Sequence, residues 1–230
     1  VGALAAEDAP MPLVSQDDAG HLRSVALNGL DLNNPFFQDL GTNGRRCSTC
    51  HLPDQAWTIT PEGVQKRFAE SRGLDPIFRT NDGSNCEGVG GSTPAERRNA
   101  YSLLLGRGLI RVGIDVPATA EFAIVAVDDP YHCGAPLTQA SMYRRPLPST
   151  NVKFLSAVMW DGRQSPAGTL VIDNLKQQSN DATQGHAQGQ PISTSLRQRS
   201  LDFPLGLSPP PAPASPPPGP GWRRQCRRPC

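Results

Sequence analysis

No run in this sequence of 230 residues approaches the ~20 consecutive apolar residues that a membrane-spanning helix requires. The chain also lacks an excess of charge of either sign, because 22 Lys and Arg residues stand against 21 Asp and Glu residues. A protein that holds nucleic acid through a general basic field carries a clear positive excess. These two absences predict a chain without a membrane span and without a nucleic-acid partner.

Apolar side chains are scarce as well. They make up 37% of the residues, the mean hydropathy is −0.41, and 24 prolines and 22 glycines interrupt the chain. Proline and glycine mark turns and loops. We therefore expect much irregular chain, in which a bound cofactor can supply apolar core that the sequence lacks.

The segment Cys47-Ser48-Thr49-Cys50-His51 has the pattern C-x-x-C-H. This pattern is typical of the covalent attachment of a c-type haem. Two thiols at this spacing can each form a thioether to a vinyl group of a porphyrin, and the histidine that follows can bind the iron. A bare C-x-x-C pair also suits half of a zinc site, a redox dithiol or a disulfide, but the adjacent histidine favours haem.

Start signals predict several short helices. Thr60 and Thr93 each precede a proline and are expected as N-caps of helices over residues 60–72 and 93–105. We also expect a helical turn at Pro35 and a helix over residues 168–178. The strand-like runs 108–114 and 121–127 could pair as one hairpin. The predicted fold is a mainly α c-type cytochrome domain over residues 25–192, with long irregular loops and one small β-hairpin.

The two ends differ from this domain in composition. Residues 1–24 are polar, and their first small residues resemble the end of a signal peptide, which predicts export to the periplasm or to another compartment outside the cytoplasm. Residues 193–230 are expected to form a disordered tail rich in proline and arginine. The composition of this tail is typical of translation out of frame, with a selected linker as the alternative.

Several further segments resemble the bacterial di-haem cytochrome c peroxidase family. Phe36-Phe37 and Leu40-Gly41 precede the haem motif as they do where that family's first haem domain opens. Similarity to its "P-T/S-x-x-N … F-W-D-G-R" segment is found at Pro148-Ser149-Thr150-Asn151 and Met159-Trp160-Asp161-Gly162-Arg163. Leu175-Lys176-Gln177-Gln178 resembles the glutamine-containing helix that follows. The resemblance covers about residues 30–190.

The resemblance implies a role for each matching residue. Cys47 and Cys50 would hold one covalent haem c, with His51 as the proximal ligand of its iron. Trp160 would match the tryptophan that passes electrons between the two haems of the family, supported by its neighbours in the W-D-G-R segment. Residues 178–188 would line the distal face of the haem, where hydrogen peroxide is cleaved.

The chain departs from the family in one respect. Family members carry a second C-x-x-C-H motif in a second domain, which a Met ligand completes. In this chain Cys226 and Cys230 are four positions apart, and no histidine follows them. We expect the sequence to stop, or to lose frame, just after the first haem domain. Catalysis would then need an external electron donor, such as a small redox protein.

The sixth iron ligand and the distal base stay open in the sequence. His186 lies in the segment that resembles the distal loop, and a histidine titrates near neutrality, so it could bind the iron or transfer protons to and from peroxide. Gln178 could only orient peroxide or water, and the same holds for Gln188. The other candidates for the sixth ligand are His132, Met142 and Met159.

Cys86 and Cys133 allow two interpretations. They could form a disulfide between irregular loops in an oxidising compartment, or complete a Cys₄ zinc site with Cys47 and Cys50. Their wide separation in sequence favours the disulfide. Residues 81–85, rich in Asn and Asp, are interpreted as a turn, with a Ca²⁺ site as the weaker alternative because the full twelve-residue loop pattern is missing.

Taken together, these features predict an exported haem oxidoreductase that reduces hydrogen peroxide with electrons from a small redox protein, either as a single chain or as a homodimer. Two other functions stay open. One is a non-enzymatic mono-haem electron carrier or sensor, and the other is a zinc-stabilised binding module.

Overall fold

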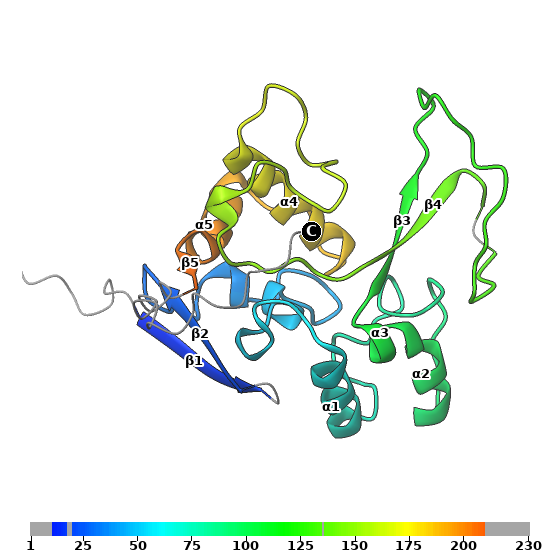
Figure 1. The fold of residues 1–230 in the computed structure, drawn as a ribbon, viewed down its shortest axis with the longest axis horizontal. Helices are drawn as coiled ribbons and strands as arrows, with labels where there is room; N and C mark the ends of the chain where they lie inside the picture. The colour runs from blue at the N-terminus through cyan, green and yellow to red at the C-terminus, as the bar shows by residue number, and fades with distance from the viewer. Residues whose placement is uncertain (1–10, 18–19, 135, 210–230) are drawn as a thin grey trace, which may run out of the picture.

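The structure, a computed structural model of the chain, describes residues 11–17, 20–134 and 136–209. Within these residues, short α-helices and two small sheets are joined by long loops (Figure 1). The expectation of a mainly α fold is therefore wrong. The elements are β1 (Met11–Asp17), β2 (Gly20–Ala26), α1 (Pro61–Ser71), α2 (Pro94–Ala100), α3 (Ser102–Arg107), β3 (Ile110–Asp115), β4 (Gln139–Arg144), α4 (Val171–Gly185), α5 (Thr194–Leu205) and β5 (Leu207–Ser208).

The first sheet brings together the two ends of the described chain. β1 pairs antiparallel with β2, from Met11 opposite Ala26 to Asp17 opposite Gly20, and β5 lies on the other side of β2. Ser24 and Ala26, two positions apart on β2, are both buried. The polar stretch expected as a leader thus contains a hairpin, because only every second side chain of such a strand has to enter the core.

The expected tail needs correction as well. Residues from 194 onward form α5 and then β5, and Leu201 and Phe203 of α5 are buried. Ser193 caps the helix, because its hydroxyl accepts a hydrogen bond from the backbone N–H of Leu196 at 3.3 Å. The signal-like residues 1–10 and the proline- and arginine-rich run at 210–230 lie outside the described residues.

The second sheet is a hairpin whose partner strand was predicted wrongly. β3 pairs with β4, so that Ile110 lies opposite Arg144 and Asp115 opposite Gln139. The predicted partner, residues 121–127, belongs to the long loop between these strands, where Val125 is 89% exposed (Figure 1). Strand propensity cannot select between the two partners, because the choice depends on contacts that are distant in sequence.

The predicted helix starts are confirmed. Thr60 accepts a hydrogen bond from the N–H of Gly63 at 3.1 Å, and Thr93 forms a reciprocal capping box with Glu96. The helix predicted over residues 93–105 is divided into α2 and α3, because the backbone of Tyr101 leaves helical geometry at φ −106° and ψ 20°. The helix expected over 168–178 is α4, which continues to Gly185.

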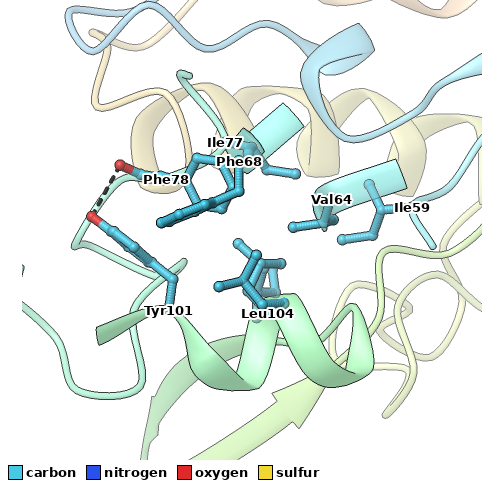
Figure 2. Packing of buried hydrophobic residues seen from close by; sticks show 9 residues of the cluster. Ile59, Val64, Phe68, Ile77, Phe78, Tyr101 and Leu104 are labelled. Atoms are coloured by element: carbon cyan, nitrogen blue, oxygen red, sulfur yellow. Dashed lines mark hydrogen bonds between the residues drawn. The ribbon is translucent and has the colours of Figure 1, made fainter. Parts of the chain in front are cut away.

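The largest apolar cluster joins α1, α3 and the loop between α1 and α2 (Figure 2). The hydroxyl of Tyr101 donates a hydrogen bond to the carbonyl of Phe78 at 3.0 Å, which satisfies a polar group inside the cluster. The buried members are Ile59, Val64, Phe68, Ile77, Phe78, Tyr101, Leu104, Leu105 and Ile110.

Two smaller clusters lie against α5. One joins the first sheet to the short 3₁₀ turn Pro35–Phe37 and to α5, and its members are Ala26, Phe36, Trp57, Phe203 and Leu207. The other packs α4 on α5 through Val152, Val158, Leu175 and Leu201. Among the described residues, none of the helices is long and apolar enough to span a membrane.

Candidate haem-attachment site

The C-x-x-C-H motif folds as a tight turn. Cys47–Thr49 form a 3₁₀ turn, and the backbone N–H groups of Cys50 and His51 both donate to the carbonyl of Cys47, at 3.1 and 3.0 Å. Arg67 of α1 donates from Nη1 to the carbonyl of Thr49 at 2.6 Å. The turn therefore brings both thiols next to the histidine, and α1 holds it from outside.

The ring of His51 is oriented by a backbone carbonyl. Its Nδ1 lies 2.9 Å from the carbonyl oxygen of Trp57. Since a carbonyl can only accept, Nδ1 carries the proton, and Nε2 of the neutral ring keeps its lone pair. Burial lowers the pKa of His51, although the carbonyls of Trp57 and Leu147 oppose this effect. The net lowering of the pKa favours a neutral imidazole, which is the form that binds a metal.

The two thiols of the motif are free and half-buried. Burial raises the pKa of Cys47 to about 11 and also raises the pKa of Cys50. A redox dithiol needs a lowered thiol pKa, so this interpretation is not supported. The Cys₄ zinc site is wrong, because Cys86 and Cys133 are joined in a disulfide, which confirms the favoured prediction for that pair. The described residues hold no group of three or more His, Cys, Asp or Glu side chains that could bind a metal ion.

The motif lies where two apolar clusters meet. Cys47 packs against the cluster that contains Phe36 and Trp57, whereas Cys50 packs against the cluster shown in Figure 2. The ring centroids of Phe36 and His51 are 6.2 Å apart. A hollow of about 280 Å³ reaches the turn at Ser48. Both cysteines therefore pack against apolar clusters, whereas the hollow beside Ser48 is lined mostly by polar and charged residues.

These residues fit a covalently bound c-type haem. Cys47 and Cys50 supply two reduced thiols on one turn, and His51 supplies an imidazole whose Nε2 makes no hydrogen bond in the part of the chain that the structure describes. The hydrogen bond to Trp57 is the kind of interaction that fixes the tautomer of a metal-binding histidine.

A buried ion pair lies close to the motif. Asp82, 6% exposed, accepts from Nη1 of Arg45 with one carboxylate oxygen and from Nδ1 of His186 with the other. Arg45 also donates to the carbonyls of Pro76 and Ile77, at 2.9 and 2.7 Å. Arg45 and Asp82 both influence the pKa of Cys50, so the pair belongs to the surroundings of the motif. Arg45 belongs to no motif that predicts a role for it, and Asp82 lies in a segment expected only as a turn.

His186 is held by its backbone as well as by its ring. Its N–H continues the hydrogen bonding of α4 by donating to Ala182, and its carbonyl accepts from Nδ2 of Asn43 at 2.8 Å. Its positive charge would lower the pKa of His51, so the two histidines belong to one electrostatic neighbourhood. His186 and His51 are thus linked by an electrostatic effect, and no hydrogen bond or ring contact joins them among the described residues.

The predicted glutamine lies elsewhere on the same helix. Gln178 is partly exposed on α4, eight residues before His186, so at about 100° per residue the two positions point about 80° apart around the axis. Gln188 is exposed, and its backbone carbonyl accepts from the hydroxyl of Thr42 at 2.9 Å.

The remaining ligand candidates lie in different surroundings. His132 is exposed in a turn at φ 53°, and Met142 lies on β4, where its sulfur accepts from Arg144 at 3.9 Å. Met159 packs against the cluster between α4 and α5. Of the four candidates, His186 is the one with a fixed ring and an electrostatic effect on His51.

Trp160 lies on the surface, and not in an enclosed position. It is 57% exposed, and its Nε1 donates to the carbonyl of Arg145 at 2.8 Å. It borders a hollow of about 440 Å³ together with Tyr143 and Arg144. Asp161 and Arg163, expected to support the indole, instead pair with each other.

The Ca²⁺ interpretation of residues 81–85 is not supported by the structure. Both carboxylate oxygens of Asp82 are taken by Arg45 and His186. The side-chain oxygen of Asn85 accepts from the backbone of Leu103 at 2.9 Å. Since a calcium site needs several free oxygens that converge, the turn interpretation fits better.

No protein-family model, curated protein or solved structure matches this chain.

Proposed function

We propose that this protein is an exported c-type haem oxidoreductase that reduces hydrogen peroxide with electrons from a small redox protein. Cys47 and Cys50 would hold the haem, and His51 would be its proximal ligand. A bound haem would supply the iron at which peroxide is reduced. This proposal follows the resemblance to the first haem domain of the bacterial di-haem cytochrome c peroxidases.

One observation carries the proposal. The ring of His51 is held with Nδ1 as donor to Trp57, so Nε2 has its lone pair available beside two free thiols. A zinc site or a redox dithiol needs thiolates, which the raised thiol pKa values of Cys47 and Cys50 disfavour. Attachment to a haem uses the cysteines as thioethers, which carry no charge.

His186 is proposed as the group that moves the proton of peroxide. A base placed within reach of a reacting proton typically contributes about 10²–10⁴ in rate. Nδ1 of His186 donates to Asp82, so its Nε2 is the nitrogen that can take a proton and return it to the leaving oxygen. In the alternative role, the same Nε2 would be the sixth ligand of a bound haem.

Trp160 is proposed as the residue through which electrons reach the site. Its indole is exposed to an external donor, and its Nε1 is bound to the carbonyl of Arg145. Leu147 lies two residues after Arg145, and its carbonyl raises the pKa of His51. A short stretch of backbone thus joins the surface indole to the histidine of the motif.

The disulfide supports an oxidising compartment. Cys86 and Cys133 are joined across 47 positions of the sequence. Disulfides persist in secreted and periplasmic proteins and are rare in the cytosol. The proposed export of the protein agrees with the attachment of c-type haem outside the bacterial cytoplasm.

The test is to produce the full chain in cells that have a c-type haem maturation system. Its absorbance spectrum is then recorded before and after acid–acetone extraction, and again after addition of hydrogen peroxide. We expect a Soret band that survives extraction and changes with peroxide. A surviving band that is indifferent to peroxide would favour an electron carrier, and absence of any band would refute the haem proposal.

Matched double variants sharpen this test. Cys47→Ser with Cys50→Ser should abolish the extraction-resistant band. Cys86→Ser with Cys133→Ser removes the same number of cysteines but leaves the motif intact, so it should retain the band in whatever protein remains folded. Equal loss of the band per folded molecule in both double variants would contradict the assignment of the motif.

A further inference from the structure

We infer that Asp82 is a positioning residue that fixes the imidazole of His186 with Nδ1 as its donor and Nε2 as its free acceptor. The significance of this arrangement for peroxide chemistry rests on the proposed function. The arrangement itself is a property of the chain and can be tested in the protein with or without haem.

The first support is the rigid placement of the carboxylate. Asp82 is 6% exposed, and its backbone carbonyl accepts from the N–H of Arg111 at 2.8 Å. Arg45, 3% exposed, contacts one carboxylate oxygen and is itself held by the carbonyls of Pro76 and Ile77. The carboxylate therefore cannot turn without breaking a buried ion pair.

The second support is the placement of the histidine. The carbonyl of His186 accepts from Asn43 at 2.8 Å, from Arg45 at 3.3 Å and from Asn81 at 3.4 Å. Backbone and ring are thus both held by the segments that contain Arg45 and Asp82. The ring meets the carboxylate through Nδ1, while 40% of the side chain of His186 is exposed on its other side.

The third support is the chemistry of the contact. A carboxylate paired with Arg45 is ionised and can only accept, so Nδ1 of His186 must be the donor. The charge and hydrogen bond of His186 together with Arg45 lower the pKa of Asp82 despite its burial, in agreement with an ionised acceptor. The lone pair of the neutral ring is therefore on Nε2, as either proposed role of His186 requires.

Three substitutions distinguish a positioning role of Asp82 from an effect on the stability of the fold. Asp82→Asn keeps the size of the side chain but offers an amide that can donate to Nδ1, which removes the preference for one tautomer. Asp75→Asn is the matched control, because Asp75 forms a similar pair with Arg67 but contacts no histidine. Asp82→Glu is the conservative variant that keeps a carboxylate.

The experiment is ¹⁵N NMR of the histidine rings in the full chain, at a pH where the rings are neutral, with the ferrous carbon-monoxide form used if haem is present. The four histidines allow His186 to be assigned by single substitution. We expect a protonated Nδ1 in the unaltered protein and in Asp75→Asn, a mixed or reversed tautomer in Asp82→Asn, and partial recovery in Asp82→Glu. A protonated Nε2 in the unaltered protein would overturn the inference, even if Asp82→Asn failed to fold.

A second readout separates this inference from the proposed function. Asp82→Asn leaves Cys47, Cys50 and His51 in place, so it should retain the extraction-resistant Soret band. The rate of peroxide reduction should fall by about tenfold to a hundredfold, as is typical when a hydrogen bond that orients a functional histidine is removed. A correct tautomer in a chain that never binds haem would refute the proposed function alone. A bound haem with an unchanged tautomer in Asp82→Asn would refute the inference alone.

Discussion

Arg67 and Asp75 form a two-pronged ion pair beside the C-x-x-C-H motif. Nε of Arg67 lies 3.0 Å from Oδ2 of Asp75, and Nη2 contacts Oδ1. The remaining nitrogen, Nη1, donates to the carbonyl of Thr49 at 2.6 Å. Because the carboxylate orients the guanidinium, this pair connects α1 to the turn that carries Cys47 and Cys50.

We expect Arg67→Ala to lower the free energy of unfolding by about 1–3 kcal/mol, because it removes charge-assisted hydrogen bonds from a partly buried position. Urea denaturation followed by fluorescence measures the change. Lys66→Ala is the control, since Lys66 is exposed on the same helix and its removal should matter by less than about 0.5 kcal/mol. Equal effects of the two substitutions would contradict the structural role of Arg67.

The stability of the haem-free chain should depend on pH through His51. Burial holds the pKa of His51 below its ordinary value, so the unfolded state takes up a proton at a higher pH than the folded state. The free energy of unfolding should therefore decrease as the pH falls below about 6.5, and should continue to decrease down to the folded-state pKa. Urea denaturation at several values between about pH 8 and pH 5 covers this window.

Two glutamine variants test whether the pH dependence of stability arises from His51. His51→Gln should flatten this part of the pH dependence, whereas His132→Gln, at an exposed position, should retain it. If both variants kept the dependence of the unaltered chain, the pH effect would arise from another group.

Loss of the disulfide should destabilise the protein by about 2–4 kcal/mol, because Cys86 and Cys133 close a long loop and restrict the unfolded chain. The measurement compares urea denaturation of the unaltered protein with that of Cys86→Ser with Cys133→Ser. A reducing agent should lower the stability of the first protein to near that of the second and leave the second unchanged. A reducing agent without effect on either protein would show that the bond does not form.

Local signals predicted the parts of the fold that depend on neighbouring residues. The starts of α1 and α2 were correct because an N-cap and its partners lie within four positions of one another, as Thr93 and Glu96 do. The pairing of β3 was wrong because its partner lies beyond a long loop, and the nearer run of β-branched residues at 121–127 has the stronger local preference. α5 was missed because the proline-rich composition after it was extended too far toward the N-terminus.

The candidate site also has one part that local sequence predicts and another part that it does not. Cys47, Cys50 and His51 lie within five consecutive positions, so the sequence alone is enough to predict haem attachment there. Asp82 is separated from His186 by 104 positions, and nothing in the sequence connects them. The single nearby clue was an arginine two positions before the first cysteine of the motif, and an arginine at a surface turn is too common to suggest a buried carboxylate partner.

The half-buried position of the two thiols has a consequence for how the molecule is held together. Cys47 packs on one apolar cluster and Cys50 on another, so a single group joined to both sulfurs would connect the two clusters covalently. Such a bridge would restrict the unfolded chain as a disulfide does, and would stabilise the folded state for the same reason.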